Sequence, residues 1–136
     1  MKEITVLAVK ENVDKVVDFI NIELESKETS IKAQTQIDVA VDEIFANISN
    51  YAYGDVEGQA TVQVDFDDES GYAVITFIDN GVPYNPLENE DPDVTLSAED
   101  REIGGLGIFI VKKTMDDIIY EYKNNQNILI IKKKIK

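Results

Sequence analysis

The sequence contains no cysteine and no histidine. Without cysteine there is no disulfide, no thiolate nucleophile and no zinc–thiolate site. Without histidine there is no Ser-His-Asp triad, no imidazole metal ligand and no phosphohistidine. An apolar run of about 18 residues is also lacking, and the amino terminus becomes polar too soon for a signal peptide. The sequence therefore predicts a cytoplasmic protein that does not enter a membrane.

Positive charge is scarce as well. The chain has 13 Lys and Arg against 27 Asp and Glu, which gives a net charge of −14. Such a chain repels the phosphates of nucleic acids and of anionic membranes, so we expect neither as a partner. The 136 residues, 43% of them hydrophobic, suffice for one packed domain over residues 1–136. Any phosphate-bearing ligand must be held by local groups.

Hydrophobic periodicity predicts the element order β-α-α-β-β-α-β-β. The two longer helices begin after capping residues, Asn12 and Ser30. The expected elements are a strand over Glu3–Val9, helices over 13–24 and from 31 to about 53, strands over 61–66 and Tyr72–Asp79, a helix from Gly104, and strands over Ile118–Lys123 and Asn127–Ile135. In the last helix Ile108, Ile110, Val111 and Met115 are expected to face inward. This order predicts an α+β fold, a two-layer sandwich with a mixed, mainly antiparallel sheet covered on one face by three helices.

Between residues 80 and 103 the periodicity stops. This segment contains three prolines, and residues 88–102 hold seven carboxylates and one arginine. The segment is either a solvated loop or a mobile lid. Long loops inside compact domains are more often functional than neutral, which favours a lid.

One polar stripe lies on the second helix, where Glu43, Asn47 and Asn50 follow one another at helical spacing near the border of the apolar face. A solvated helix face is the ordinary explanation for such residues. However, the surrounding segment is mostly apolar, and an amide oxygen suits Mg²⁺ while a carboxylate can accept a proton. The stripe therefore predicts polar groups at a cleft.

Asp79 ends an apolar strand and is followed by Asn80-Gly81-Val82-Pro83. These residues are also common in simple turns. A strand-end carboxylate can instead accept a hydrogen bond from an exocyclic amine such as that of adenine, and Gly81 would let a flat base approach the backbone.

Three glycines in four residues, Gly104-Gly105-Leu106-Gly107, precede an apolar helix. Glycines can simply start a helix, but that role rarely requires three. Such a backbone can bend around phosphates, which the helix amides and dipole attract. The chain has no G-x-x-x-x-G-K-[ST] P-loop and no G-x-G-x-x-G dinucleotide motif. A calcium loop starting at Asp65 is excluded because Ser70 and Thr76 occupy its glycine and final glutamate positions.

These segments occur in a fixed order: Glu43-x-x-x-Asn47, Asp79-Asn80-Gly81-Val82-Pro83 and Gly104-Gly105-Leu106-Gly107-Ile108. Together they resemble the three nucleotide-binding boxes of the GHKL ATPase and kinase superfamily. The short length and the sequences VDEIFANISNYAYG and REIGGLGIFIVKKTMD resemble the anti-sigma factor serine kinases of bacteria. The resemblance covers nearly the whole chain and implies a Bergerat ATP-binding fold with ATP and Mg²⁺ as ligands.

The resemblance also implies residue roles. Asn47 would coordinate Mg²⁺, Glu43 would act as the base on a serine hydroxyl, and Asp79 would hold the adenine amine. Arg101 would reach the terminal phosphate, although a surface ion pair with Glu99 or Glu102 also explains it. The resemblance implies that a lid over roughly Pro86–Ile103 covers the phosphates. The other nucleotide contacts are expected from Asn50, Gly81, Pro83, Gly104, Gly105, Leu106 and Gly107.

For function, the resemblance implies a homodimeric anti-sigma factor with serine kinase activity. It would transfer the γ-phosphate of ATP to a serine of an anti-sigma factor antagonist and would sequester a sigma factor. The alternative is a non-catalytic, ATP-dependent protein-binding module of the same fold, in which the nucleotide orders the lid. A third alternative, the ATPase half of a sensor histidine kinase, is disfavoured because a dimerisation and phosphoacceptor helix is missing. Fold and nucleotide site do not by themselves fix the partner.

Overall fold

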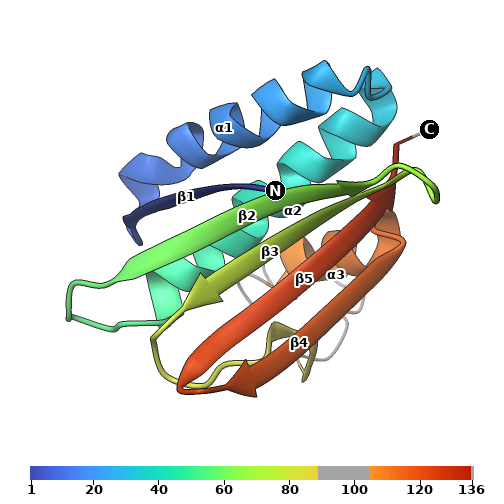
Figure 1. Ribbon diagram of the computed structural model, residues 1–136. Coiled ribbons are helices and arrows are strands. Elements are labelled where there is room, and N and C mark those ends of the chain that lie inside the picture. The colour runs from blue at the N-terminus through green and yellow to red at the C-terminus, as the bar shows by residue number, and fades with distance from the viewer. Residues whose placement is uncertain (89–104, 136) are drawn as a thin grey trace.

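The computed structural model describes residues 1–88 and 105–135. Five strands form one sheet in the order β1-β2-β3-β5-β4, and every neighbouring pair is antiparallel. The strands are β1 (Lys2–Leu7), β2 (Gln59–Asp67), β3 (Tyr72–Asp79), β4 (Asp117–Lys123) and β5 (Gln126–Lys134). The helices are α1 (Val13–Ser26), α2 (Ile31–Tyr51) and α3 (Gly105–Thr114). Figure 1 shows the three helices behind the sheet, which confirms the predicted two-layer α+β fold.

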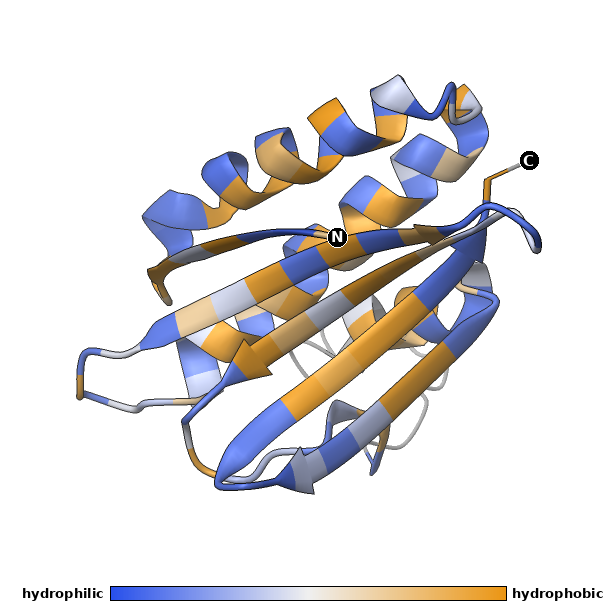
Figure 2. Ribbon diagram, viewed as in Figure 1, coloured by the Kyte–Doolittle hydropathy of each residue, from blue (hydrophilic) through white to orange (hydrophobic). Residues whose placement is uncertain are grey.

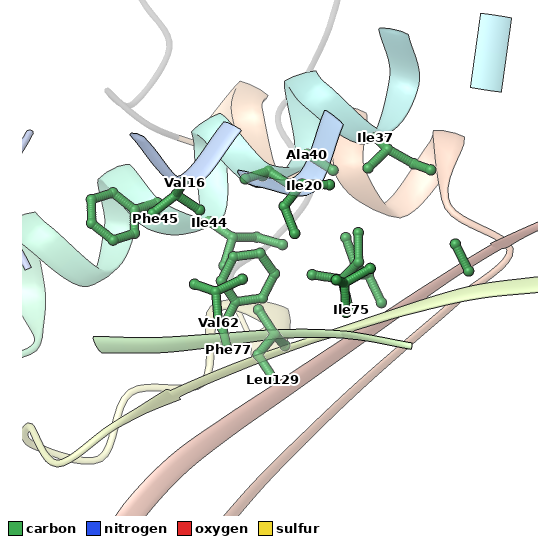
Figure 3. Packing of buried hydrophobic residues seen from close by; sticks show 14 of the residues in the cluster. Val16, Ile20, Ile37, Ala40, Ile44, Phe45, Val62, Ile75, Phe77 and Leu129 are labelled. Carbon is green, nitrogen blue, oxygen red and sulfur yellow. The ribbon is translucent and has the colours of Figure 1, made fainter. Parts of the chain in front are cut away.

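The core fills the space between the sheet and the helices. Every second residue of β3 is buried, since side chains alternate between the two faces of a strand. The buried stripes of α1 and α2 follow helical spacing and pack on these strands, as Figure 3 shows. In Figure 2 the middle of β5 is hydrophobic, whereas both of its ends are hydrophilic. Large side chains that are almost completely buried include Phe45, Phe77, Ile20, Leu24, Ile37, Ile44, Ile75 and Ile131.

The two predicted helix caps have different outcomes. Ser30 caps α2 as expected, since its side chain accepts a hydrogen bond from the backbone N–H of Ala33 at 3.1 Å. The cap predicted at Asn12 is wrong, because this side chain makes no capping hydrogen bond. A short 3₁₀ turn, η1 (Lys10–Asn12), precedes α1, and the Asn12 amide donates to the Leu7 carbonyl at 2.9 Å. Asn12 therefore closes the connection from β1 to α1.

The segment after α2 connects the end of this helix to the start of β2 and to the loop after β3 through hydrogen bonds of Tyr53. The helix ends at Tyr51, two residues earlier than expected, and Tyr53 leaves the helical path. Its hydroxyl donates to the Gln59 carbonyl at 2.5 Å and accepts from the Asn80 N–H at 2.9 Å. A side chain at Gly58 would collide with the Tyr53 ring. Tyr53 thus fixes the start of β2 and the loop after β3 against the end of α2.

The last helix, α3, lies beside α2 and packs on the core through Ile108 and Val111. Met115, just after the helix, is buried as expected. Ile110 was expected to face inward but is 38% exposed, because a step of about 100° per residue turns it away from Val111. At the other end, the Lys133 ammonium donates to the Thr114 carbonyl at 2.8 Å and satisfies a terminal acceptor.

Two further expectations concern the lid and the membrane. Only the first turn of the expected lid, η2 (Pro86–Glu88), is described; the remainder, through Ile103, lies outside the described residues. Within residues 1–88 and 105–135, no helix combines the length and the apolar character that crossing a membrane requires.

Candidate functional site

A pocket opens between the helix layer and the sheet. One wall comes from α2, the floor from β3 and β5, and the rim from β4 and the loop after β3. The described lining residues are Ile44, Asn47, Ile48, Ala52, Phe77, Asp79, Tyr84, Pro86, Tyr120, Asn127 and Leu129. Most of this surface is apolar, with a few polar groups at defined positions.

Asp79 is the buried carboxylate of the pocket. It ends β3 on the inner face of the sheet, and only 5% of its surface is exposed. Its Oδ1 atom accepts hydrogen bonds from the Gly81 N–H and from the Asn127 side-chain amide, both at 2.9 Å. From the described residues, no hydrogen bond reaches Oδ2. One oxygen is therefore held by the protein while the other can accept from a ligand.

Gly81 sets how closely the loop after β3 approaches α2. A Cβ atom at this position would collide with the carbonyl oxygen of Ala52, and the next N–H, that of Val82, donates to that same oxygen at 2.8 Å. Only glycine permits this contact. The expected role of Gly81 beside a flat base stays a prediction. Pro83 is exposed and is not part of the described lining.

The helix stripe predicted on α2 reaches two parts of the site. Asn47 lines the pocket, and its Nδ2 atom is buried with no hydrogen-bond partner in the described part of the chain. Glu43, one turn earlier, lies against Gly107 of α3, where an added Cβ would collide with the Glu43 carboxylate. Burial raises the pKa of Glu43 above its ordinary value of 4.5, and the nearby charge of Asp42 raises it further. The Glu43 carboxylate therefore binds a proton more readily than an ordinary glutamate does, as suits a proton acceptor.

Asn47 also meets the chemical requirements of a Mg²⁺ ligand. An unpaired buried amide nitrogen is costly, and phosphate oxygens of a bound nucleotide would supply its missing acceptor. The amide oxygen of the same side chain is a hard ligand that Mg²⁺ accepts. No group of three or more acidic side chains that could hold a metal alone occurs among the described residues, so the ion would depend on the nucleotide phosphates as well.

The remaining predicted residues do not belong to the described lining of the pocket. Asn50, near the end of α2, is exposed and does not belong to the described lining. Gly105 and Leu106 begin α3, whose N-terminal amides suit an anion. Arg101 and Gly104 lie outside the described residues.

Among the polar residues of the described lining, three were not predicted as site residues: Tyr84, Tyr120 and Asn127. A signal for Asn127 does exist in the sequence. It shares the inward parity of Leu129 and Ile131 on β5, so a polar residue occupies a position where the pattern predicts an apolar one. The sequence gives no such signal for the two tyrosines. Their place in the lining depends on the path of the loop after β3 and on the position of β4 in the sheet.

The sequence profile of the histidine kinase-like ATPase domain matches residues 6–133, which is nearly the whole chain. The chain belongs to this family. Because the family lies within the GHKL superfamily, the coarser part of the sequence resemblance is confirmed. A comparison with curated protein sequences gives no significant match.

Solved structures agree with the histidine kinase-like ATPase fold. The catalytic domain of the histidine kinase ThkA superposes with a TM-score of 0.51 at 13% identity, over 99% of this chain and 98% of that one. The histidine kinase domain of the blue-light activated kinase EL346 from Erythrobacter litoralis gives a TM-score of 0.50 at 19% identity. That match covers 76% of this chain but only 45% of the other, so this chain spans less than half of that protein. These similarities show the fold.

Proposed function

We propose that this protein is an ATP-dependent serine kinase that phosphorylates an anti-sigma factor antagonist and sequesters a sigma factor. The observation that carries the kinase proposal is the position of Glu43. Its carboxylate lies against Gly107 in the first turns of α3, one helical turn from Asn47 in the pocket. A carboxylate that can accept a proton therefore lies beside the start of α3, whose amides suit phosphates, and one helical turn from Asn47, whose amide oxygen suits Mg²⁺.

The pocket accounts for the nucleotide. Apolar side chains such as Phe77 and Ile48 can pack against the two faces of a purine, and Asp79 Oδ2 can accept from its 6-amino group. The triphosphate would then extend toward Asn47 and the N-terminus of α3, where backbone amides and the helix dipole favour anions. The net charge of −14 repels a triphosphate, and these local groups attract it.

The reaction requires little covalent chemistry from the protein. The serine oxygen forms a new bond to the γ-phosphorus of ATP, and the bond from that phosphorus to the β–γ bridging oxygen breaks, which releases ADP. The hydroxyl proton passes to the Glu43 carboxylate. Bound Mg²⁺ would supply charge neutralisation at the phosphates, with Asn47 as its ligand from the protein. Orientation and proton acceptance are then the roles of Asn47 and Glu43.

The choice of an antagonist and a sigma factor as partners rests on the sequence resemblance alone, as does the preference for serine. The alternative, a non-catalytic ATP-dependent binding module, uses the same pocket but does not need Glu43 as a base. Transfer of phosphate therefore separates the two functions.

The test is incubation of the purified chain with radiolabelled Mg-ATP and the antagonist encoded nearest to its gene, followed by mapping of phosphoserine. We expect Glu43→Gln to lower the transfer rate by at least about a hundredfold, since general-base catalysis contributes roughly 10²–10⁴. The affinity for Mg-ATP should change by less than about threefold, because the substitution preserves shape.

Asp42→Asn is the matched control. This neighbouring residue is exposed and is removed from the pocket lining, so transfer measured at pH 8 should stay close to the wild-type rate. Equal transfer by Glu43→Gln and wild type would disprove the base. Saturable Mg-ATP binding without any transfer by the wild type would support the binding module instead.

A further inference from the structure

We propose that Asn127 is a positioning residue that sets the choice of nucleobase, by orienting Asp79 so that one carboxylate oxygen is left to accept the adenine amine. This inference rests on the proposed binding of ATP in the pocket. It assigns a role to a residue that is 48 positions away from Asp79 in the sequence and directly opposite it in the sheet.

Asn127 is a buried polar residue with all of its hydrogen-bonding groups in use. It begins the inner face of β5 and is 6% exposed. Its Nδ2 atom donates to Asp79 Oδ1 at 2.9 Å and to the Val82 carbonyl at 2.8 Å. Its Oδ1 atom accepts from the Tyr84 N–H at 3.1 Å and from the Tyr120 hydroxyl. Two donated and two accepted bonds satisfy the amide.

The partners determine which way the amide points. The Tyr84 N–H can only donate and therefore requires the amide oxygen, whereas the Val82 carbonyl can only accept and therefore requires the amide nitrogen. With the amide fixed in this way, its second N–H must point at Asp79. The direction of the hydrogen bond from Asn127 to Asp79 thus follows from the backbone groups of Tyr84 and Val82.

This arrangement fixes the Asp79 carboxylate. The two donors that reach it from residues 1–88 and 105–135, Asn127 Nδ2 and the Gly81 N–H, converge on Oδ1, which leaves Oδ2 to accept from a ligand. A purine with a 6-amino group donates to such an oxygen, whereas a purine with a 6-oxo group places an acceptor against it and is rejected. Without the donor from Asn127 the carboxylate could rotate, and the base contact would lose its fixed geometry.

Aspartate is the informative substitution at this position. It keeps the size of the side chain. In its ionised form it cannot donate to Asp79 or to the Val82 carbonyl, and it adds a like charge beside Asp79. Its matched control is Asn124→Asp, which adds the same charge on the exposed turn of the same hairpin. Asn124 has a φ of 55°, a conformation that aspartate tolerates.

The experiment is calorimetric titration of the full chain with Mg-ATP and with Mg-inosine triphosphate, which differs from ATP in carrying a 6-oxo group. We expect the wild type and Asn124→Asp to prefer ATP strongly. In Asn127→Asp the ratio of the ATP affinity to the inosine triphosphate affinity should fall by about tenfold, as expected for the loss of one hydrogen bond to a charged group. A purely structural role would instead weaken both nucleotides equally and leave the ratio unchanged, and that result would overturn the proposal.

If Asn127→Asp does not fold, Tyr120→Phe is titrated with the same two nucleotides in its place. This variant preserves the ring and removes one of the two donors that hold the Asn127 oxygen, so the affinity ratio should fall by about threefold. An unchanged ratio in Tyr120→Phe would overturn the proposal in that case.

Asp79→Asn distinguishes a failure of the proposed role of Asn127 from a failure of the proposed ATP binding. Because an amide can donate where a carboxylate cannot, this variant should lose the preference for ATP. If it does so while Asn127→Asp keeps the wild-type ratio, only the role of Asn127 is wrong. If the wild type binds no ATP, or if Asp79→Asn binds ATP unchanged, the proposed function fails together with this inference.

Discussion

Glu43 lies where burial, and then the neighbouring charge of Asp42, disfavour its ionised form, so its pKa is raised above 4.5. A base works only when deprotonated. The rate of phosphate transfer should therefore fall as the pH drops through this raised pKa, at a higher pH than an ordinary glutamate would give. The measurement is a profile of kcat/KM against pH between pH 5 and 8.5, because kcat/KM reports the free enzyme.

Asp42→Asn tests the sign of the effect. Removing a like charge lowers the pKa of Glu43. The fall of kcat/KM at acidic pH should therefore occur at a lower pH than in the wild type, while the value of kcat/KM at high pH stays constant. If this fall stays at the same pH or moves to higher pH, another group titrates in the profile.

The polar residues of the site differ in how far the sequence predicts them. Asp79 and Asn47 could be selected because each interrupts an apolar pattern on a single element. Asn127 shows the same interruption, but its importance depends on β3 and β5 being neighbours, which no local pattern indicates. Asn12 was misassigned because an asparagine before a helix can accept from the helix or donate backward, and here it donates to Leu7.

The second helix carries Glu43 and Asn47, so its N-terminal cap supports the site indirectly. Ser30→Ala removes the acceptor for the Ala33 N–H and should lower the free energy of unfolding by about 1 kcal/mol. Chemical denaturation with urea measures the change. ATP affinity should be retained well below the midpoint, because the cap is several turns away from Asn47.

Ser26→Ala provides the comparison within α1. Ser26 is exposed, and its hydroxyl donates to the Glu23 carbonyl rather than capping an N-terminus. Its loss should change the free energy of unfolding by less than about 0.5 kcal/mol. Equal effects of the two substitutions would show that the Ser30 cap contributes nothing specific.

Element boundaries were predictable where local chemistry decides them. The strand Tyr72–Asp79 was predicted to the residue, since Gly71 and the Asn80-Gly81 turn bound a continuous apolar segment. The end of α2 was placed too late, because the position of Tyr53 is set by distant backbone groups of Gln59 and Asn80. The rotation of α3 was also misjudged at Ile110, since a helix that is apolar nearly all round does not indicate which side faces the core.

At the scale of the whole molecule, the site exists because the sheet order and the packing of α2 against α3 bring together residues that are far apart in the chain. Asp79 from β3 meets Asn127 from β5, and Glu43 from α2 meets Gly107 from α3. The family match over residues 6–133 agrees with this arrangement. We expect the resulting pocket to hold Mg-ATP in one orientation.

The most direct test is a crystal structure of the chain with Mg²⁺ and a non-hydrolysable ATP analogue. We predict that the 6-amino group of adenine lies within hydrogen-bonding distance of Asp79 Oδ2, that the Asn47 amide oxygen ligates Mg²⁺, and that the γ-phosphate lies near Glu43 and Gly107. A nucleotide bound elsewhere, or an empty pocket at saturating concentrations of the analogue, would contradict the account.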